Sequence, residues 1–411
     1  MTTTQDRLSD LHGAAVRYYR QQLAKPDDDA ARARAVLDER GIPAAARTAY
    51  EIGYAPPGWT NLTDHLRRTA GATDAELLDA GLGLLTQRQT VVDRFRDRVM
   101  LPVRDAGSRH VIAFLGRRMD DRARPDDPKY LNSPDTALWR KGEQLYGFGA
   151  RGVPAKLAKG APIAVAEGPL DAIAASYSGP YIGVAPCGTA LTAAQAQLLA
   201  RTAGPLEDRR IVTAWDADAG GRDAAVRAYD LLTAAGAWPY NATLPAGDDP
   251  AALRQRLGPN ALQAALDDAE PLARVVLDAR MEPWRDRLQW AEGRVNAVRS
   301  VAPVLAAMPI HRVAGESAYV IQTYSLDAQP LNEAVVEIIL RDLDSGGDAA
   351  GRATGPGRER HTTGPDVVAA APAAARTAFP TPLAQTPRPA LGPASLGAPP
   401  RAPATAHARR R

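Results

Sequence analysis

The chain has 411 residues, a length sufficient for two or three domains with a sizeable hydrophobic core. Its formal net charge is only +3, but 9 Arg and 3 acids within residues 346–411 give that tail +6 and leave −3 for the remainder. Cys187 is the single cysteine, which excludes an intramolecular disulfide and a cysteine-based zinc site, so no zinc is expected. We expect a cytoplasmic protein with no membrane partner, because no run approaches the roughly 20 apolar residues of a membrane helix.

The first 150 residues are predicted to combine helices with a strand-containing segment. Residues 8–50 place apolar and aromatic side chains at helical spacing, and Gly41 suits a helix C-cap. Further helices are expected at 62–69 and 74–80. Between 91 and 119, apolar runs interrupted by Asp-Ala-Gly-Ser predict a strand, a turn and a second strand.

Positive charge is concentrated in this strand-containing segment and in the loop that follows it. The segment contains Arg94, Arg96, Arg98, Arg104, Arg109, Arg117 and Arg118, and the loop contains Lys129, Tyr130, Asn132, Ser133 and Lys141. Basic residues interleaved with an aromatic ring and amides suit a phosphate backbone or a nucleotide. A solvated basic face would have the same composition, so both interpretations stay open on the residues alone.

Residues 161–250 alternate short apolar runs with helical patterns. Strands are predicted at 163–166, 181–185, 211–215 and 240–244, with helices at 169–177, 191–202 and 221–235. This alternation is typical of βαβ units and a parallel sheet. Cys187, between the second strand and the second helix, is interpreted as a small buried residue rather than a nucleophile.

Carboxylates follow three of these predicted strands. Glu167 and Asp171 come after the first, Asp216 and Asp218 after the third, and Asp248 and Asp249 after the fourth. Ligands of parallel sheets lie beyond the carboxyl ends of the strands, so these acids are expected to converge on one edge. Oxygen ligands held so close together predict a hard divalent cation, Mg²⁺ or Mn²⁺.

The rest of the chain is predicted to be helical and then disordered. Residues 251–342 read as a helical bundle, with core candidates Trp284, Trp290, Val295, Val298, Val301, Val304 and Leu305. The run 334–343 is expected to end the ordered chain. Beyond Gly346 the Ala-, Pro-, Gly-, Thr- and Arg-rich composition predicts disorder.

Six sequence blocks together resemble a known family. In chain order they are RFRDRVMLPVRD, PKYLNSPDTALWRKGEQLYGF, EGPLDAIA, GTALT, DADAGGRDAA and GDDPAAL. Residues 8–272, which contain them, resemble the catalytic core of bacterial DnaG-type DNA primases. Glu167-Gly168 and Asp216-Ala217-Asp218 look like the two signatures of the Toprim domain. Each signature is weak alone, whereas six blocks in the same order are specific.

The resemblance implies an α/β fold in which a Rossmann-like Toprim sheet lies between a mixed N-terminal subdomain and a helical bundle. The expected divisions are 1–150, 160–255, 256–344 and the tail 345–411. It implies synthesis of short RNA primers on single-stranded DNA from ribonucleoside triphosphates, with a replicative helicase as a further partner.

The same resemblance assigns roles to individual residues. Glu167, Asp216 and Asp218 would be catalytic metal ligands, with Asp171 and Asp249 adding acidity. Nucleotide and DNA would be bound by Lys129, Tyr130, Asn132, Ser133 and Lys141, and by Arg94, Arg96 and Arg117. Two carboxylates at i and i+2 past a strand end lie on the same side of a site, and metal ions can stabilise both oxygens of an in-line displacement.

Three departures from the family pattern refine the expectation. First, the match to the core starts near the first residue, and the Cys/His zinc-binding domain that normally precedes it in the family is not seen. Second, the usual Phe-Gly-Gly-Arg reads Phe114-Leu115-Gly116-Arg117. Third, no full helicase-binding domain is evident. This architecture favours a primase of a plasmid, phage or integrated element. Alternative hypotheses are a Toprim-type nuclease that uses the same acids, and a non-catalytic accessory DNA-binding protein of replication.

Overall fold

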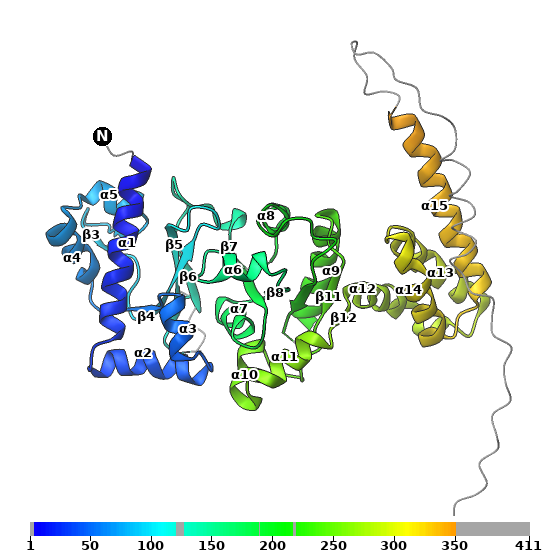
Figure 1. Cartoon of the computed structure of the whole chain (residues 1–411), viewed down its shortest axis with the longest axis horizontal. Coiled ribbons are helices and arrows are strands. Elements are labelled where there is room, and N and C mark those ends of the chain that lie inside the picture. The colour runs from blue at the N-terminus through cyan, green and yellow to red at the C-terminus, as the bar shows by residue number, and fades with distance from the viewer. Residues whose placement is uncertain (1–3, 121–126, 189, 217–218, 351–411) are drawn as a thin grey trace, which may run out of the picture. The chain divides into compact units, whose positions relative to one another are not determined.

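The computed structural model describes residues 4–120, 127–188, 190–216 and 219–350, all within one compact unit, Met1–Pro356. The first part of the chain forms five helices, as the helical spacing predicted (Figure 1). They are α1 (Thr4–Leu23), α2 (Asp28–Glu39), α3 (Ala44–Ala49), α4 (Asn61–Ala70) and α5 (Asp74–Asp79). The side chain of Asp27 caps α2, and Thr73 with Glu76 forms a capping box on α5.

A four-stranded antiparallel sheet follows, in the order β1-β4-β5-β6. The predicted strand–turn–strand is β4 (Arg98–Arg104) and β5 (Val111–Arg118), flanked by β1 (Gly53–Ala55) and β6 (Tyr130–Asn132). Helix α1 packs on β1 and β5, and a Cβ on Gly53 would lie 2.5 Å from that of Tyr19. A separate hairpin pairs β2 (Gly83–Leu85) with β3 (Val91–Asp93).

The second sheet has six strands in the order β12-β11-β10-β8-β9-β7. Its four parallel strands are those that the apolar runs predicted: β8 (Ile163–Ala166), β9 (Ile182–Pro186), β10 (Ile211–Ala214) and β11 (Pro239–Asn241). The short edge strands β7 (Leu145–Tyr146) and β12 (Glu270–Pro271) run antiparallel to their neighbours. The fold is therefore α/β with a doubly wound sheet, as expected.

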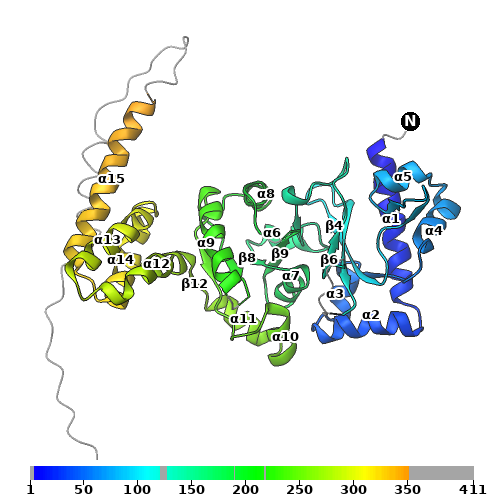
Figure 2. The ribbon, with the colours of Figure 1, turned by 180° about the vertical axis from the view of Figure 1, so that it is seen from behind.

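Helices cover both faces of this sheet (Figures 1 and 2). Helix α7 (Pro169–Ser176) packs with α10 (Pro250–Leu257) and α11 (Pro259–Asp267). Helix α9 (Ala219–Ala234) packs with α8 (Ala193–Ala203) and with α12 (Leu272–Met281). The connection from β6 to β8 contains η1 (Lys141–Glu143) and α6 (Val153–Ala158).

The C-terminal helices continue from α12 through η2 (Glu282–Arg287), α13 (Ala291–Ala306), α14 (Ile310–Tyr324) and α15 (Ala328–Ala350). Among the predicted bundle residues, Val301 and Leu305 are buried, but Trp290 and Val295 lie exposed on the outer side of the bundle. Helix α15 also extends past residue 343, where the ordered chain was expected to end. The predicted disordered stretch lies outside the described residues from 351 onward.

None of the helices described is both long and apolar enough to span a membrane.

Candidate functional site

A cavity of about 320 Å³ brings together residues from both sheets and from the N-terminal helices. Its sheet wall includes Glu167, Asp171, Asp216 and Asp249, and its N-terminal wall comprises Leu115, Lys129, Tyr130, Asn132 and Lys141. Arg40 and Cys187 also line it. Four predicted acids and four predicted nucleotide-binding residues thus share one cavity. Asp218, the fifth acid predicted for the metal site, lies outside the described residues, and Asp248 pairs with Arg256 outside the cavity lining.

The parallel sheet accounts for the convergence of the acids. Strand β8 ends at Ala166, so Glu167 stands at its carboxyl end, and Asp171 lies in the first turn of α7. Strand β10 pairs directly with β8 and ends at Ala214, which puts Asp216 at the same edge. Asp249 is the N-cap of α10, where its side chain accepts a hydrogen bond of 2.7 Å from the Ala252 amide.

Two of the four acids are held by a cation of the protein itself. Arg40, the C-cap residue of α2, donates a 2.6 Å hydrogen bond to Asp249 and lies 4.0 Å from Asp171. Asp171 also accepts a 3.2 Å hydrogen bond from the Ala251 amide. Burial and the neighbouring Asp249 raise the pKa of Asp171 to about 7, while Arg40 opposes that increase. Burial alone would lower the pKa of Arg40. The attraction of the Asp249 and Asp171 carboxylates outweighs the effect of burial, so the pKa of Arg40 is raised.

Arg40 was not among the residues predicted from the sequence. Its segment reads as packing helices, and 209 positions separate it from Asp249. Within the acidic edge, Asp171 and Asp249 are paired with Arg40, and Glu167 and Asp216 also line the cavity.

The donor chemistry of the cavity suits a hard divalent cation. Glu167 and Asp216 offer carboxylate oxygens beside the shared cavity, and oxygen is the ligand that Mg²⁺ and Mn²⁺ prefer. Among the described residues, no three His, Cys, Asp or Glu side chains lie close enough together to hold a metal ion by themselves. Asp218, which was also predicted to be a metal ligand, lies outside the described residues.

The N-terminal wall presents ammonium groups and hydrogen-bonding side chains to these acids. Lys129, Tyr130 and Asn132 come from β6 and the residue before it, and Lys141 begins η1. Asn132 donates a 2.6 Å hydrogen bond to the Cys187 carbonyl, which ties β6 to the end of β9. Burial raises the pKa of the Cys187 thiol to about 12, so the thiol stays protonated and is no nucleophile.

Ser133 directly follows β6 and is not among the residues that line the cavity. Its amide donates to the Phe114 carbonyl at 2.9 Å, and its hydroxyl accepts from the Phe114 amide at 3.0 Å. Ser133 therefore extends the hydrogen bonding between this part of the chain and β5. Its hydroxyl helps to position β6 and does not itself line the cavity.

The arginines of the basic segment separate into buried and accessible groups. Arg98, Arg117 and Arg118 are buried. A solvated basic face or an open DNA groove would instead expose these side chains. Arg98 donates to the Gly116 carbonyl at 2.9 Å, and Arg117 hydrogen-bonds Tyr130 beneath the cavity. These guanidinium groups stabilise the sheet that carries the N-terminal wall.

Arg94 and Arg96 lie nearer the surface. Arg94 donates to the Asn132 carbonyl at 2.9 Å, and burial lowers its pKa. The guanidinium of Arg96 stacks over the ring of Trp59, 4.4 Å from the centroid, and Trp59 is 63% exposed. Sequence reasoning missed Trp59, although an aromatic residue in a turn before a basic segment is a usable signal for base stacking.

Comparison with known protein families gave two matches that cover most of the region described above. Residues 18–151 match the family described as "DNA primase catalytic core, N-terminal domain", and residues 164–253 match the family described as "Toprim-like". A DNA primase of Streptomyces coelicolor is 36% identical over 301 residues, which cover 73% of this chain and 45% of that protein. A DNA primase of Escherichia coli is 35% identical over 304 residues, covering 71% and 48%. The chain thus spans about half the length of these curated relatives.

Solved structures resemble the fold over a similar range. The RNA polymerase domain of the Mycobacterium tuberculosis primase DnaG has a TM-score of 0.66 and 32% identity, covering 79% of this chain and all of that one. A DnaG primase catalytic domain bound to ssDNA has a TM-score of 0.63 and 31% identity, covering 79% and 98%.

Proposed function

Because this chain belongs to the family of DnaG-type DNA primase catalytic cores, we propose that it synthesises short RNA primers on a single-stranded DNA template. The observation that supports this reaction is the single cavity in which Glu167 and Asp216 face Lys129 and Lys141. Nucleotidyl transfer requires both kinds of charge in one place, since a metal-binding edge must lie beside groups that neutralise a triphosphate.

Each wall has its own task in this reaction. Glu167 and Asp216, with Asp218, would hold Mg²⁺ or Mn²⁺ through carboxylate oxygens. The bound ion would supply Lewis acidity and neutralise charge at the reacting phosphate. Lys129 and Lys141 bind the triphosphate of the incoming ribonucleotide as compact cations, and Asn132 and Tyr130 fix its position in the cavity.

The template is proposed to lie along the surface that carries Arg94, Arg96 and Trp59. Arg96 supplies charge for the phosphate backbone, and the exposed ring of Trp59 beside it offers a stacking face for a base. A related catalytic domain has been solved with ssDNA, and the M. tuberculosis domain with double-stranded DNA, which supports a DNA template here. A replicative helicase is proposed as a partner, and a plasmid, phage or integrated element as the setting.

The proposed division of the chain follows the proposed roles. Residues 1–150 bind template and nucleotide, residues 160–255 hold metal, residues 256–344 form the helical part, and the basic tail 345–411 adds attraction to nucleic acid. Asp171 and Asp249 contribute to the acidic edge through their pairing with Arg40.

Primer synthesis with labelled ribonucleotides tests the proposal directly. The full chain is incubated with single-stranded DNA and Mg²⁺ or Mn²⁺, alone and with a helicase or a separate zinc-domain protein added. We expect short RNA products that disappear in Asp216→Ala and fall by at least about a hundredfold in Glu167→Gln. Absence of product under all conditions would refute the proposal, and cleaved DNA in its place would show a Toprim-type nuclease.

A further inference from the structure

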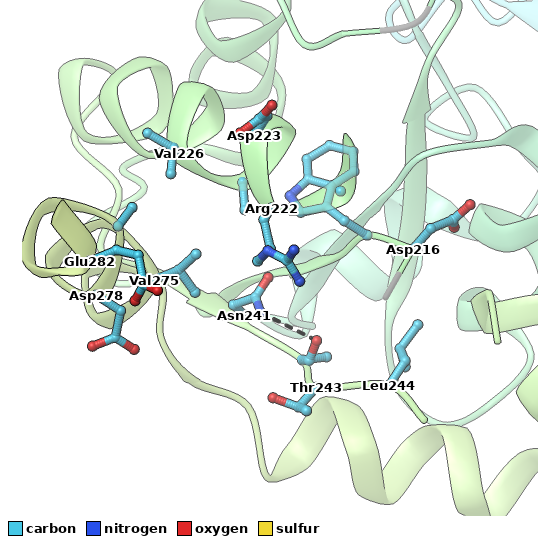
Figure 3. Close-up of a pocket in the computed structure, with 15 residues that line it drawn as sticks. Asp216, Arg222, Asp223, Val226, Asn241, Thr243, Leu244, Val275, Asp278 and Glu282 are labelled. Carbon is cyan, nitrogen blue, oxygen red and sulfur yellow. Dashed lines mark hydrogen bonds between the residues drawn. The ribbon is translucent and has the colours of Figure 1, made fainter. Parts of the chain in front are cut away.

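A second and larger cavity, of about 730 Å³, also has Asp216 in its lining (Figure 3). Its walls are the ends of β10 and β11, the first turns of α9, and α12 with the start of η2. Asp216 lines both this cavity and the candidate site, so the two cavities share this residue. A cavity of this size can hold a nucleotide.

Hydrogen-bond donors gather at the end of the cavity next to Asp216. In Figure 3 the guanidinium of Arg222 reaches from α9 toward Asn241 and Thr243 at the end of β11. Arg222 forms no ion pair with the residues that the structure describes. Trp215, 5% exposed, also lines the cavity, and its indole N–H has no acceptor among the described residues. A buried donor without a partner costs free energy, so this end is suited to a ligand rich in acceptor oxygens.

Two of the four carboxylate residues that line the cavity lie at its other end, whereas Asp216 and Asp223 adjoin Trp215 and Arg222 in the chain. Asp278 and Glu282 come from α12 and η2, away from Arg222 in Figure 3. Asp278 accepts hydrogen bonds from Tyr319 at 2.9 Å and from Tyr324 at 2.8 Å, so its charge is satisfied by α14. Among the described residues, Arg222 is the one cationic residue of this lining and can receive a phosphate, whereas Asp278 and Glu282 disfavour a phosphate at the far end.

Building on the proposed function, we propose that this second cavity is the subsite for the 3′-terminal nucleotide of the growing primer. In-line transfer forms a bond from the primer 3′ oxygen to the α-phosphorus. It breaks the bond from that phosphorus to pyrophosphate, which leaves on the opposite side, and the hydroxyl proton passes to water. The two substrates must therefore flank the metal-bearing edge. The lysines place the triphosphate in the first cavity, which leaves the second for the primer.

Each donor then has a defined partner on the primer. Arg222 contacts the phosphate that joins the last two nucleotides, because a guanidinium suits a phosphodiester. The Thr243 hydroxyl faces the ribose, where the 2′-hydroxyl distinguishes an RNA terminus from a DNA terminus. The side chain of Asn241 already accepts a hydrogen bond of 2.9 Å from the Thr213 hydroxyl. The subsite thus recognises an RNA 3′ end.

Primer binding and extension test this assignment with an RNA oligonucleotide annealed to a DNA template. We expect Arg222→Ala to raise the KM for the primer–template about tenfold, while the KM for the incoming ribonucleotide stays unchanged. Arg227→Ala, an exposed arginine on the same helix and outside both cavities, is the matched control and should behave as the unaltered protein. Thr243→Val, which preserves side-chain shape, should reduce the preference for an RNA over a 2′-deoxy terminus.

A binding readout separates this inference from the proposed reaction. The affinity for a primer that ends in a 3′-deoxynucleotide is measured by fluorescence anisotropy, which requires no turnover. Equal primer affinity in Arg222→Ala and Arg227→Ala would overturn the subsite even if the unaltered chain synthesises primers. Loss of primer affinity in Arg222→Ala from a chain that makes no product would instead refute the proposed reaction and leave the subsite standing.

Discussion

The ion pair between Arg40 and Asp249 permits a quantitative test of how the acidic edge is stabilised. The side chains of Arg40, Asp249 and Asp171 are 18%, 18% and 9% exposed, so Arg40→Ala leaves two neighbouring carboxylates largely out of water. At an effective dielectric constant near 20, one charge pair about 4 Å apart is worth about 4 kcal/mol. Removing one partner of a buried pair typically costs 3–5 kcal/mol. Protonation of Asp171 relieves part of this cost, so we expect a loss of about 3 kcal/mol at pH 7.

Urea unfolding at 25 °C provides the measurement, with the denaturant dependence checked for equality between variants. Arg32→Ala is the matched control, because Arg32 pairs with Asp29 at 2.9 Å on the surface, where both side chains are exposed. Exposed pairs contribute less than about 1 kcal/mol, so the control should unfold almost as the unaltered chain does. A loss in Arg40→Ala no greater than in Arg32→Ala would refute the reasoning that Arg40 neutralises this edge.

Divalent cations extend the same test. Without Arg40, the carboxylates of Asp171 and Asp249 become available to a metal ion, and a ligand that binds the folded state alone raises the free energy of unfolding. We therefore expect Mg²⁺ or Mn²⁺ to stabilise Arg40→Ala more than the unaltered chain. An equal gain in both proteins would show that Arg40 and the metal ion do not compete for these acids.

Three further predictions concern the N-terminal part of the chain. Asp93 accepts two amide hydrogen bonds of 2.8 Å from the start of α4, so Asp93→Ala should lower the free energy of unfolding by about 2 kcal/mol, and Asp93→Asn by less. Trp59→Ala should weaken binding of a labelled single-stranded oligonucleotide about tenfold in fluorescence anisotropy, whereas Trp290→Ala, equally exposed at 59%, should leave it unchanged. Burial lowers the pKa of His12, so the unfolded chain takes up its proton first as the pH falls through about 6.5. The unaltered chain should therefore lose more stability than His12→Gln between about pH 7 and pH 5, and a gain on acidification would contradict the neutral imidazole.

The strands of the second sheet could be predicted closely because their apolar runs are continuous and buried. The prediction 163–166 coincides with β8, and 211–215 exceeds β10 by one residue. The prediction 240–244 fits less well, since β11 ends at Asn241 and the apolar residues after it, Ala242 and Leu244, are buried by packing outside the strand. Apolar character reports burial, and only pairing with a neighbour defines a strand.

Charge was harder to interpret from sequence than apolar character. Composition shows where arginines are dense but not which are buried, and Arg98, Arg117 and Arg118 are held inside by carbonyl, carboxylate and hydroxyl partners. Arg40 shows that composition also fails to identify which charged residues pair with each other. Helical spacing placed it in a packing segment, and its pairing with Asp249 depends on tertiary structure that no local pattern encodes.

The contacts around Arg40 also hold the two walls of the candidate site in position relative to each other. Arg254 donates to the Gly41 carbonyl, and the Tyr50 hydroxyl donates to Ser176 at 2.9 Å, so residues 40–50 are joined to α7 and α10 at several points. These bonds connect the N-terminal helices to the acidic edge, and Asn132 connects the N-terminal wall to the end of β9. The separation between the lysines and the acids is therefore set by the protein before any nucleotide binds. A preorganised site of this kind loses little entropy on binding, so a change at Arg40 should weaken nucleotide affinity although Arg40 belongs to neither proposed ligand set.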